Sequence, residues 1–164
     1  MSNTTNRKEN SPWWKGVTRY QWLVLVIASL GWIFDTFEGQ IFVTSMNEMM
    51  SSLLPADVPL EKRDAVAKLA LGVFLIGGAV GGVFFGMLSD RIGRARTMVI
   101  TILMYSVFTG LTAFSQNAWQ MIVLRFFVAM GVGGEWAVAS AMVAEVIPRW
   151  ARVRSLGIFH ATST

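Results

Sequence analysis

The chain has no cysteine and only one histidine, and each shortage removes a class of function. Without cysteine it forms no disulfide and carries no thiolate nucleophile or thiolate-bound metal. The single histidine, His160, cannot form the histidine cluster of a catalytic metal site, and we expect it to be packed or hydrogen-bonded. Gly133, Gly134 and Glu135 have no accompanying nucleophile. We therefore expect a protein that is not an enzyme and that uses no metal or cofactor.

Charged residues are also scarce. They make up 15% of 164 residues, against 54% hydrophobic residues, and the mean hydropathy is +0.51. So few polar residues cannot coat a soluble globule. Several apolar runs approach the roughly 20 residues that cross a hydrocarbon core about 30 Å thick. The sequence thus predicts an all-α integral membrane protein with helices over about 21–43, 69–88, 98–114 and 119–146, and an incomplete fifth helix over 155–164.

The segments outside these helices predict the domain organisation. Residues 1–20 are polar and basic and form a tail without a cleavable signal peptide. Residues 44–68 contain Pro55 and Pro59 and are expected to form an external loop with a short amphipathic helix. The fifth apolar segment is about half the length of a span. Residues 21–164 are therefore expected to be part of a transporter domain, and the chain to be a fragment.

The basic residues explain the net charge of +4. Ten of them precede the first helix, follow the second or follow the fourth, and these positions share one side of the membrane. By the positive-inside rule that side is the cytoplasm, so the tail is cytoplasmic and the location is the plasma (inner) membrane. The basic excess orients the chain and does not indicate a nucleic-acid partner. The ten residues are Arg7, Lys8, Lys15, Arg19, Arg91, Arg94, Arg96, Arg149, Arg152 and Arg154.

A short basic turn, GMLSDRIGRARTM at residues 86–98, joins the second and third apolar segments. A tight turn with glycine and arginine between two membrane-length helices is a topological marker and a candidate moving joint. Its candidate functional residues are Gly86, Asp90, Arg91, Gly93 and Arg94.

This turn has expected partners at the cytoplasmic end of the fourth helix. Asp90 is expected to accept hydrogen bonds from backbone N–H groups at a helix start. Arg94 and Arg96 can reach Glu145, and Arg152 competes for the same acid. The alternative is that the arginines act only as topology anchors.

Four charged residues stand out well inside the predicted spans, where a charge costs several kcal/mol unless it is paired, hydrated or functional. They are Asp35 and Glu38 on the first helix and Arg125 and Glu135 on the fourth. At 1.5 Å per residue, Asp35 lies about 21 Å from the inner face and Arg125 about 9 Å from the outer face. In a core about 30 Å thick these levels nearly coincide. An Asp35–Arg125 ion pair is thus possible, with Glu38 one turn away on nearly the same face.

Two interpretations of these charges remain open. Asp35, Glu38 and Arg125 form either a static buried ion network or a site where one carboxylate takes up and releases a proton. In the second case proton and anionic substrate compete for, or share, Arg125. Glu135 is either a second proton site or a buried acid bonded to Trp136 or a neighbouring helix.

Small residues recur on the second and fourth helices. Gly78, Gly82 and Gly86 are spaced by four, as are Gly77 and Gly81, and Gly133 lies in a similar series on the fourth helix. In lipid, such residues let helices approach closely. Gly78, Gly82 and Gly133 are therefore expected to pack helices together, either statically or as a surface against which another helix slides.

Four patterns together resemble the major facilitator superfamily of secondary transporters. The turn at 86–98 is similar to the superfamily's signature between helices 2 and 3, with Ala95 at a commonly basic position. The segment Arg125–Trp136 resembles the helix 4 pattern of sugar- and metabolite-type members, and Glu145, Pro148 and Arg152 resemble the family's helix 4 end. FDTFE at 34–38 is similar to the helix 1 motif of aromatic-acid proton symporters, with Thr36 and Glu38 as departures.

The resemblance implies twelve spans in two halves, alternating access and a central cavity lined by helices 1 and 4. It also implies that the turn at 86–98 acts as a cytoplasmic latch. We expect transport of a small organic solute, by proton-coupled symport of an organic acid or sugar. The partners would be the lipid bilayer, the solute, protons and a missing carboxyl-terminal half. Alternatives are an uncoupled facilitator, a drug/proton antiporter, or, more distantly, a membrane scaffold or channel subunit.

Overall fold

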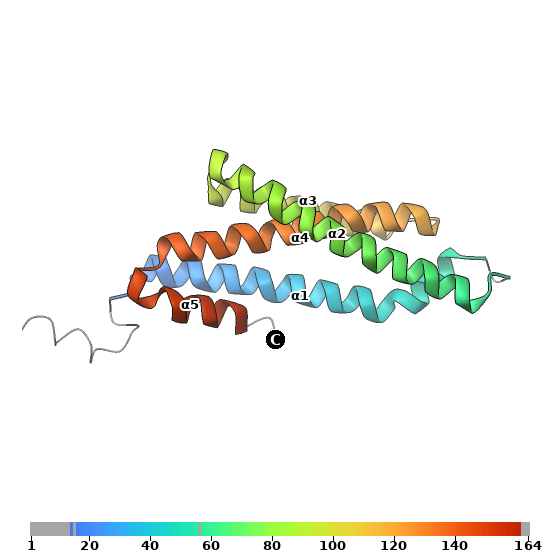
Figure 1. The fold of residues 1–164 in the computed structure, drawn as a ribbon, viewed down its shortest axis with the longest axis horizontal. Coiled ribbons are helices and arrows are strands. Elements are labelled where there is room, and N and C mark those ends of the chain that lie inside the picture. The colour runs from blue at the N-terminus through green and yellow to red at the C-terminus, as the bar shows by residue number, and fades with distance from the viewer. Residues whose placement is uncertain (1–13, 15, 56, 162–164) are drawn as a thin grey trace, which may run out of the picture.

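The computed structural model describes residues 14, 16–55 and 57–161, and within these ranges all regular structure is helical (Figure 1). The expected all-α fold is confirmed. Most of the expected tail, residues 1–13 and 15, lies outside the described residues, as do 162–164. The helices are α1 (Arg19–Leu53), α2 (Leu60–Ile92), α3 (Arg94–Thr112), α4 (Ala118–Val146) and α5 (Arg149–Ala161).

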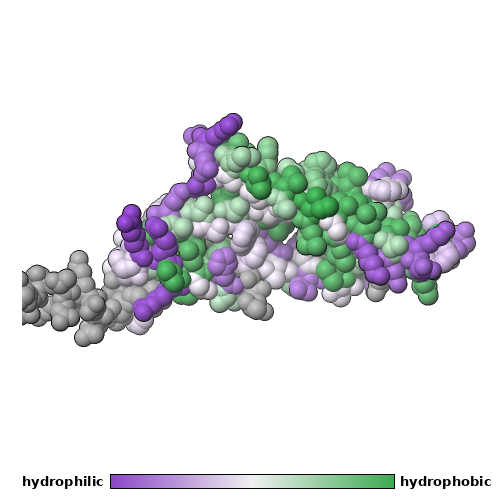
Figure 2. Space-filling view, viewed as in Figure 1, coloured by the Kyte–Doolittle hydropathy of each residue, from purple (hydrophilic) through white to green (hydrophobic). Residues whose placement is uncertain are grey.

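The first four helices are long and apolar enough to cross a membrane. On the face shown in Figure 2, hydrophilic residues gather at the two ends of the bundle and hydrophobic residues cover much of the middle. The amino-terminal end of α1, the α2–α3 turn and the α4–α5 turn lie toward one end (Figure 1). This is the arrangement of a multi-pass integral membrane protein.

The expected external loop over 44–68 is wrong in extent, because α1 continues to Leu53 and α2 begins at Leu60. The physical reason is packing beyond the span. Met46 and Met50 are buried in one cluster with Ala70 of α2 and Met121 of α4. These contacts favour continued helix, so only residues 54–59, which include both prolines of the predicted loop, connect α1 and α2.

The helix ends are set by local sequence. Thr18 and Gln21 form a reciprocal capping box at the start of α1, and Asn117 caps α4. Gly93 ends α2 and begins α3 at φ +94°, a conformation that favours glycine. The fifth helix begins at Arg149, earlier than the expected 155, because Pro148 suits the start of a new helix. Its 13 residues are shorter than a span.

Helix α4 is the centre of the bundle and packs against α1, α2, α3 and α5. The main core cluster brings together Leu25 and Ala28 of α1, Phe85 of α2, Val138 of α4 and Phe159 of α5. Because α1 and α4 run antiparallel, residues of α1 approach α4 over most of a span. This interface contains the intramembrane charges.

Glycines do bring α2 and α4 together, but the closest contacts are not all at the expected positions. A Cβ at Gly133 would overlap the backbone of Gly78, and one at Gly81 would overlap the backbone of Met130. Gly82 has ordinary clearance, with Gly133 O 3.5 Å from its Cβ position, and Gly86 has no such neighbour within 4 Å among the described residues. The tight helix crossing therefore depends on Gly77, Gly81 and Gly133, with Gly78 supplying the backbone that faces Gly133.

Substituting Gly81 with alanine should force α2 away from α4. We expect a loss of about 1–3 kcal/mol of stability, as for other overpacked cores, measured by thermal unfolding in detergent. Gly86→Ala is the matched control on the same helix and should unfold at or above the unchanged protein's temperature. Equal unfolding temperatures for the two variants would contradict this packing.

Candidate functional site

The candidate site lies along the antiparallel interface of α1 and α4. At one end the side-chain amide of Gln21 donates to the carbonyl of Val146 at 2.9 Å. Toward the other end Arg125 meets Glu38. Asp35 lies one turn of α1 from Glu38, and Glu135 contacts α1 at Gly31. Four ionisable groups thus occupy a single apolar interface.

Arg125 is paired with Glu38. Its Nη1 donates to Glu38 Oε1, and its guanidinium carbon lies 4.1 Å from the ring centroid of Phe42. The two charged side chains are only 9% and 16% exposed. A buried pair with aromatic support holds a charge that would otherwise be costly in this interior.

The expected Asp35–Arg125 pair is not formed among the described residues. Glu38 takes that place because it lies one turn nearer the carboxyl-terminal end of α1 and has the longer side chain. The predicted depth of Arg125 relative to the acids of α1 was therefore correct to within about one helical turn.

Asp35 is buried without a cation. It is 3% exposed, and neither carboxyl oxygen has a hydrogen-bond partner in the described part of the chain. An ionised carboxylate in such a place bears the full cost of lost hydration. The position is suited to a neutral carboxyl group.

Glu135 is the second buried acid without a cation. It is 1% exposed, and its carboxyl oxygens have no hydrogen-bond partner among the residues described. The expected alternative, a bond to Trp136, is therefore not present. Instead Oε1 lies against Gly31, so closely that a Cβ there would overlap it.

Aromatic side chains lie beside this interface. The rings of Trp32 and Trp136 have centroids 6.2 Å apart, Trp32 is equally far from Phe159, and Trp136 is 6.1 Å from His160. His160 is thus packed in an aromatic cluster, as expected. The cluster joins α1, α4 and α5 around one side of the site.

Two hollows adjoin these residues. A cavity of about 340 Å³ reaches Arg125 between the carboxyl-terminal ends of α1 and α3, with Ser52, Thr109, Thr112 and Ser115 among its lining residues. An apolar groove of about 540 Å³ runs between α2 and α4 and includes Trp32 and Trp136. Arg125 is therefore one of the residues that line this cavity.

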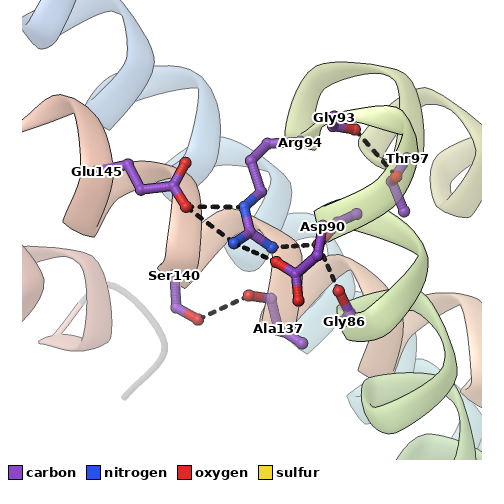
Figure 3. Close-up of polar contacts among 9 residues, drawn as sticks. Gly86, Asp90, Gly93, Arg94, Thr97, Ala137, Ser140 and Glu145 are labelled. Atoms are coloured by element: carbon purple, nitrogen blue, oxygen red, sulfur yellow. Dashed lines mark hydrogen bonds and ion pairs between the residues drawn. The ribbon is translucent and has the colours of Figure 1, made fainter.

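A second cluster lies at the opposite end, where the α2–α3 turn meets the end of α4 (Figure 3). Arg94 binds Asp90 through Nη2 at 2.6 Å and Glu145 through Nε and Nη2 at 3.0 and 2.8 Å. It also donates to the hydroxyl of Ser89. One arginine thus connects α2, α3 and α4.

The remaining turn residues correct the sequence prediction. Asp90 lies in the last turn of α2 and pairs with Arg94, and no side chain caps α3. Arg91, Arg96 and Arg152 form no ion pair with the residues described. For Arg152 the reason is that α4 ends at the extended backbone of Ile147, so Arg152 lies in a separate helix, α5.

Several contributors escaped the sequence analysis. Gly31 seats Glu135, Phe42 supports Arg125, and Ser89 binds Arg94. Gly31 lies four residues before Asp35, on the same helix face, so its spacing was an available signal. Phe42, four residues after Glu38, carried the same signal, whereas Ser89 did not.

Comparisons with known proteins agree with this architecture. A sequence profile described as Major Facilitator Superfamily matches residues 30–164. The chain, a multi-span helical membrane protein, therefore belongs to the major facilitator superfamily.

Its curated relatives are named as transporters. One is a probable 4-methylmuconolactone transporter of Cupriavidus pinatubonensis, 36% identical over 91% of this chain and 33% of the relative. The niacin transporter of Acinetobacter baylyi is 32% identical over 95% and 33%. The sialic acid transporter of Escherichia coli is 34% identical over 84% and 32%. The chain thus spans about a third of the length of these relatives.

Proposed function

We propose that this chain is the amino-terminal part of an alternating-access transporter of small organic acids. Residues 1–20 would be its cytoplasmic tail, and residues 21–164 part of the first six-helix domain. The basic residues around α1, the α2–α3 turn and the start of α5 favour a cytoplasmic amino terminus in the plasma (inner) membrane. A carboxyl-terminal half would complete the cavity.

The observation that carries the proposal is the Arg125–Glu38 pair beside the unpaired Asp35. Arg125 offers a guanidinium, which suits a carboxylate, and its Nε has no partner among the described residues. A substrate carboxylate that shares or takes Arg125 adds negative charge next to Asp35. Protonation of Asp35 relieves that repulsion, so anion and proton would bind together. Proton symport follows from this linkage.

The substrate class is drawn from chemistry common to the site and the relatives. Niacin and sialic acid, named for two of the relatives, each carry one carboxylate. A carboxylate is also a group that an arginine guanidinium binds well. We therefore propose a small monocarboxylate as the substrate.

Uptake by the full-length protein in liposomes tests this function. Nicotinate and sialic acid serve as probes, with and without a pH gradient that is acidic outside. A coupled proton should raise accumulation about tenfold for a gradient of about one pH unit. Accumulation that does not depend on the pH gradient would identify an uncoupled facilitator. Efflux driven by the pH gradient would identify an antiporter. Failure to transport either acid would contradict the substrate class.

The Asp90–Arg94–Glu145 cluster is proposed as a cytoplasmic latch. Asp90 and Glu145 have side chains 65% and 57% exposed, and exposed ion pairs contribute only about 0–1 kcal/mol each. Such weak bonds suit a contact that forms and breaks once per transport cycle. In contrast to the buried Arg125 pair, the latch should affect turnover more than stability.

Asp90→Asn is the direct test of the latch. The variant should express, bind substrate and unfold within about 1 kcal/mol of the unchanged protein, but it should transport slowly because Arg94 loses its charged partner on α2. Arg96→Gln is the control in the same turn and should leave turnover intact. Unchanged turnover in Asp90→Asn would reject the latch.

A further inference from the structure

The α1–α4 interface holds more acid than its cation can balance. Three carboxyl groups, those of Asp35, Glu38 and Glu135, share it with one guanidinium, Arg125, and only Glu38 is paired. A bound monocarboxylate would add a fourth carboxyl group. One proton on Asp35 would still leave two buried carboxylates in excess.

Glu135 has a built position in this interface. Its carboxyl group is held against Gly31 of α1, where any larger residue would displace it. The group is 1% exposed and lacks a partner in the described residues. The structure therefore accommodates this carboxyl group, but no cation among the described residues balances its charge.

The ionisable groups that face Glu135 offer no cation close by. They comprise Asp35 and Glu38 on α1, Tyr105 on α3, Arg125 on α4 and, through Trp136, His160 on α5. Arg125 lies ten residues away on the same helix, about 15 Å along its axis, and is bound to Glu38. The ionisable residues of α2 lie only near its two ends, in 61–68 and 90–91.

We propose that Glu135, seated on Gly31, is a second proton-binding site and that two protons accompany each monocarboxylate. Asp35 and Glu135 each gain a proton from outside and lose it inside. Two positive charges and one negative charge then enter together, so uptake moves one net positive charge inward. This inference rests on the proposed proton symport and adds its stoichiometry.

Membrane potential separates this inference from the proposed function. In liposomes with equal pH on both sides, an inside-negative potential of about 100 mV should raise nicotinate accumulation up to about 50-fold when one net charge moves. Glu135→Gln should remove this effect yet keep accumulation driven by a pH gradient. Glu48→Gln, at an exposed position on α1, is the control and should behave as the unchanged protein.

The outcomes are distinguishable. Uptake driven by the pH gradient but indifferent to potential in the unchanged protein would overturn the second proton site and keep the symport. Uptake indifferent to the pH gradient would reject the symport itself. The potential dependence of uptake is measured on the unchanged protein, so this test remains valid even if Glu135→Gln does not fold.

Gly31→Ala tests the seat of Glu135 independently. The added methyl group should displace the carboxyl group and reduce the potential dependence, while Gly39→Ala, with open space at its Cβ position, should not. Infrared spectroscopy of the purified protein at neutral pH supplies a readout without substrate. Glu135→Gln should remove a protonated-carboxyl band, and an unchanged spectrum would contradict protonation of this residue.

Discussion

Replacing Arg125 with alanine is expected to lower the unfolding free energy by about 3–5 kcal/mol, the usual cost of leaving a buried charge without its partner. Glu38 would remain in the α1–α4 interface with no cation beside it in the described chain, and Phe42 would lose the guanidinium stacked on its ring. Thermal unfolding of the purified protein in detergent measures this loss. Because Arg125 is also the proposed carboxylate site, substrate affinity should fall about 30-fold or more.

Two further variants identify the cause. Arg125→Ala combined with Glu38→Gln should recover much of the stability, since the stranded charge is gone, but should not recover substrate binding. Arg96→Ala, which removes an arginine without an ion pair to the described residues, should unfold within about 0.5 kcal/mol of the unchanged protein. If Arg125→Ala were as stable as Arg96→Ala, the buried pair would have no structural role.

The fold was largely readable from the sequence because the bilayer imposes simple rules. Apolar runs and the distribution of arginines predicted four spans, and small-residue spacings predicted close helix packing. The helix ends beyond the membrane were less predictable. Residues 46–53 and 60–68 are amphipathic, and whether such segments continue a helix depends on partners distant in sequence, here Met121 for Met46 and Met50.

The sequence predicted which residues belong to the site, but it did not predict which acid pairs with Arg125. Helical rise placed Arg125 level with the α1 acids, but it cannot decide between Asp35 and Glu38, which are about 4.5 Å apart along the axis. Side-chain length and helix rotation decide that, and both require coordinates. The same limit applies at the end of α4, where a break at Ile147 separates Arg152 from Glu145.

Asp35→Asn should separate stability from coupling. Asparagine keeps the shape of the side chain and removes the charge, so the unfolding temperature should equal or exceed that of the unchanged protein, in contrast to Arg125→Ala. Transport should change instead. With one proton site lost, accumulation driven by a gradient of about one pH unit should fall about tenfold. Uptake of nicotinate into liposomes, compared between Asp35→Asn and the unchanged protein under the same gradient, measures this loss of accumulation.

Exchange across the membrane isolates the proton step. Counterflow of labelled nicotinate, with equal pH on both sides, requires substrate binding and alternation but no net proton release. It should persist in Asp35→Asn because Arg125 and Glu38 are intact. Asp35→Asn combined with Glu135→Gln should then lose all accumulation driven by pH while it retains counterflow. If Asp35→Asn accumulated as much substrate as the unchanged protein, Asp35 would carry no proton, and its burial without a partner would require another explanation.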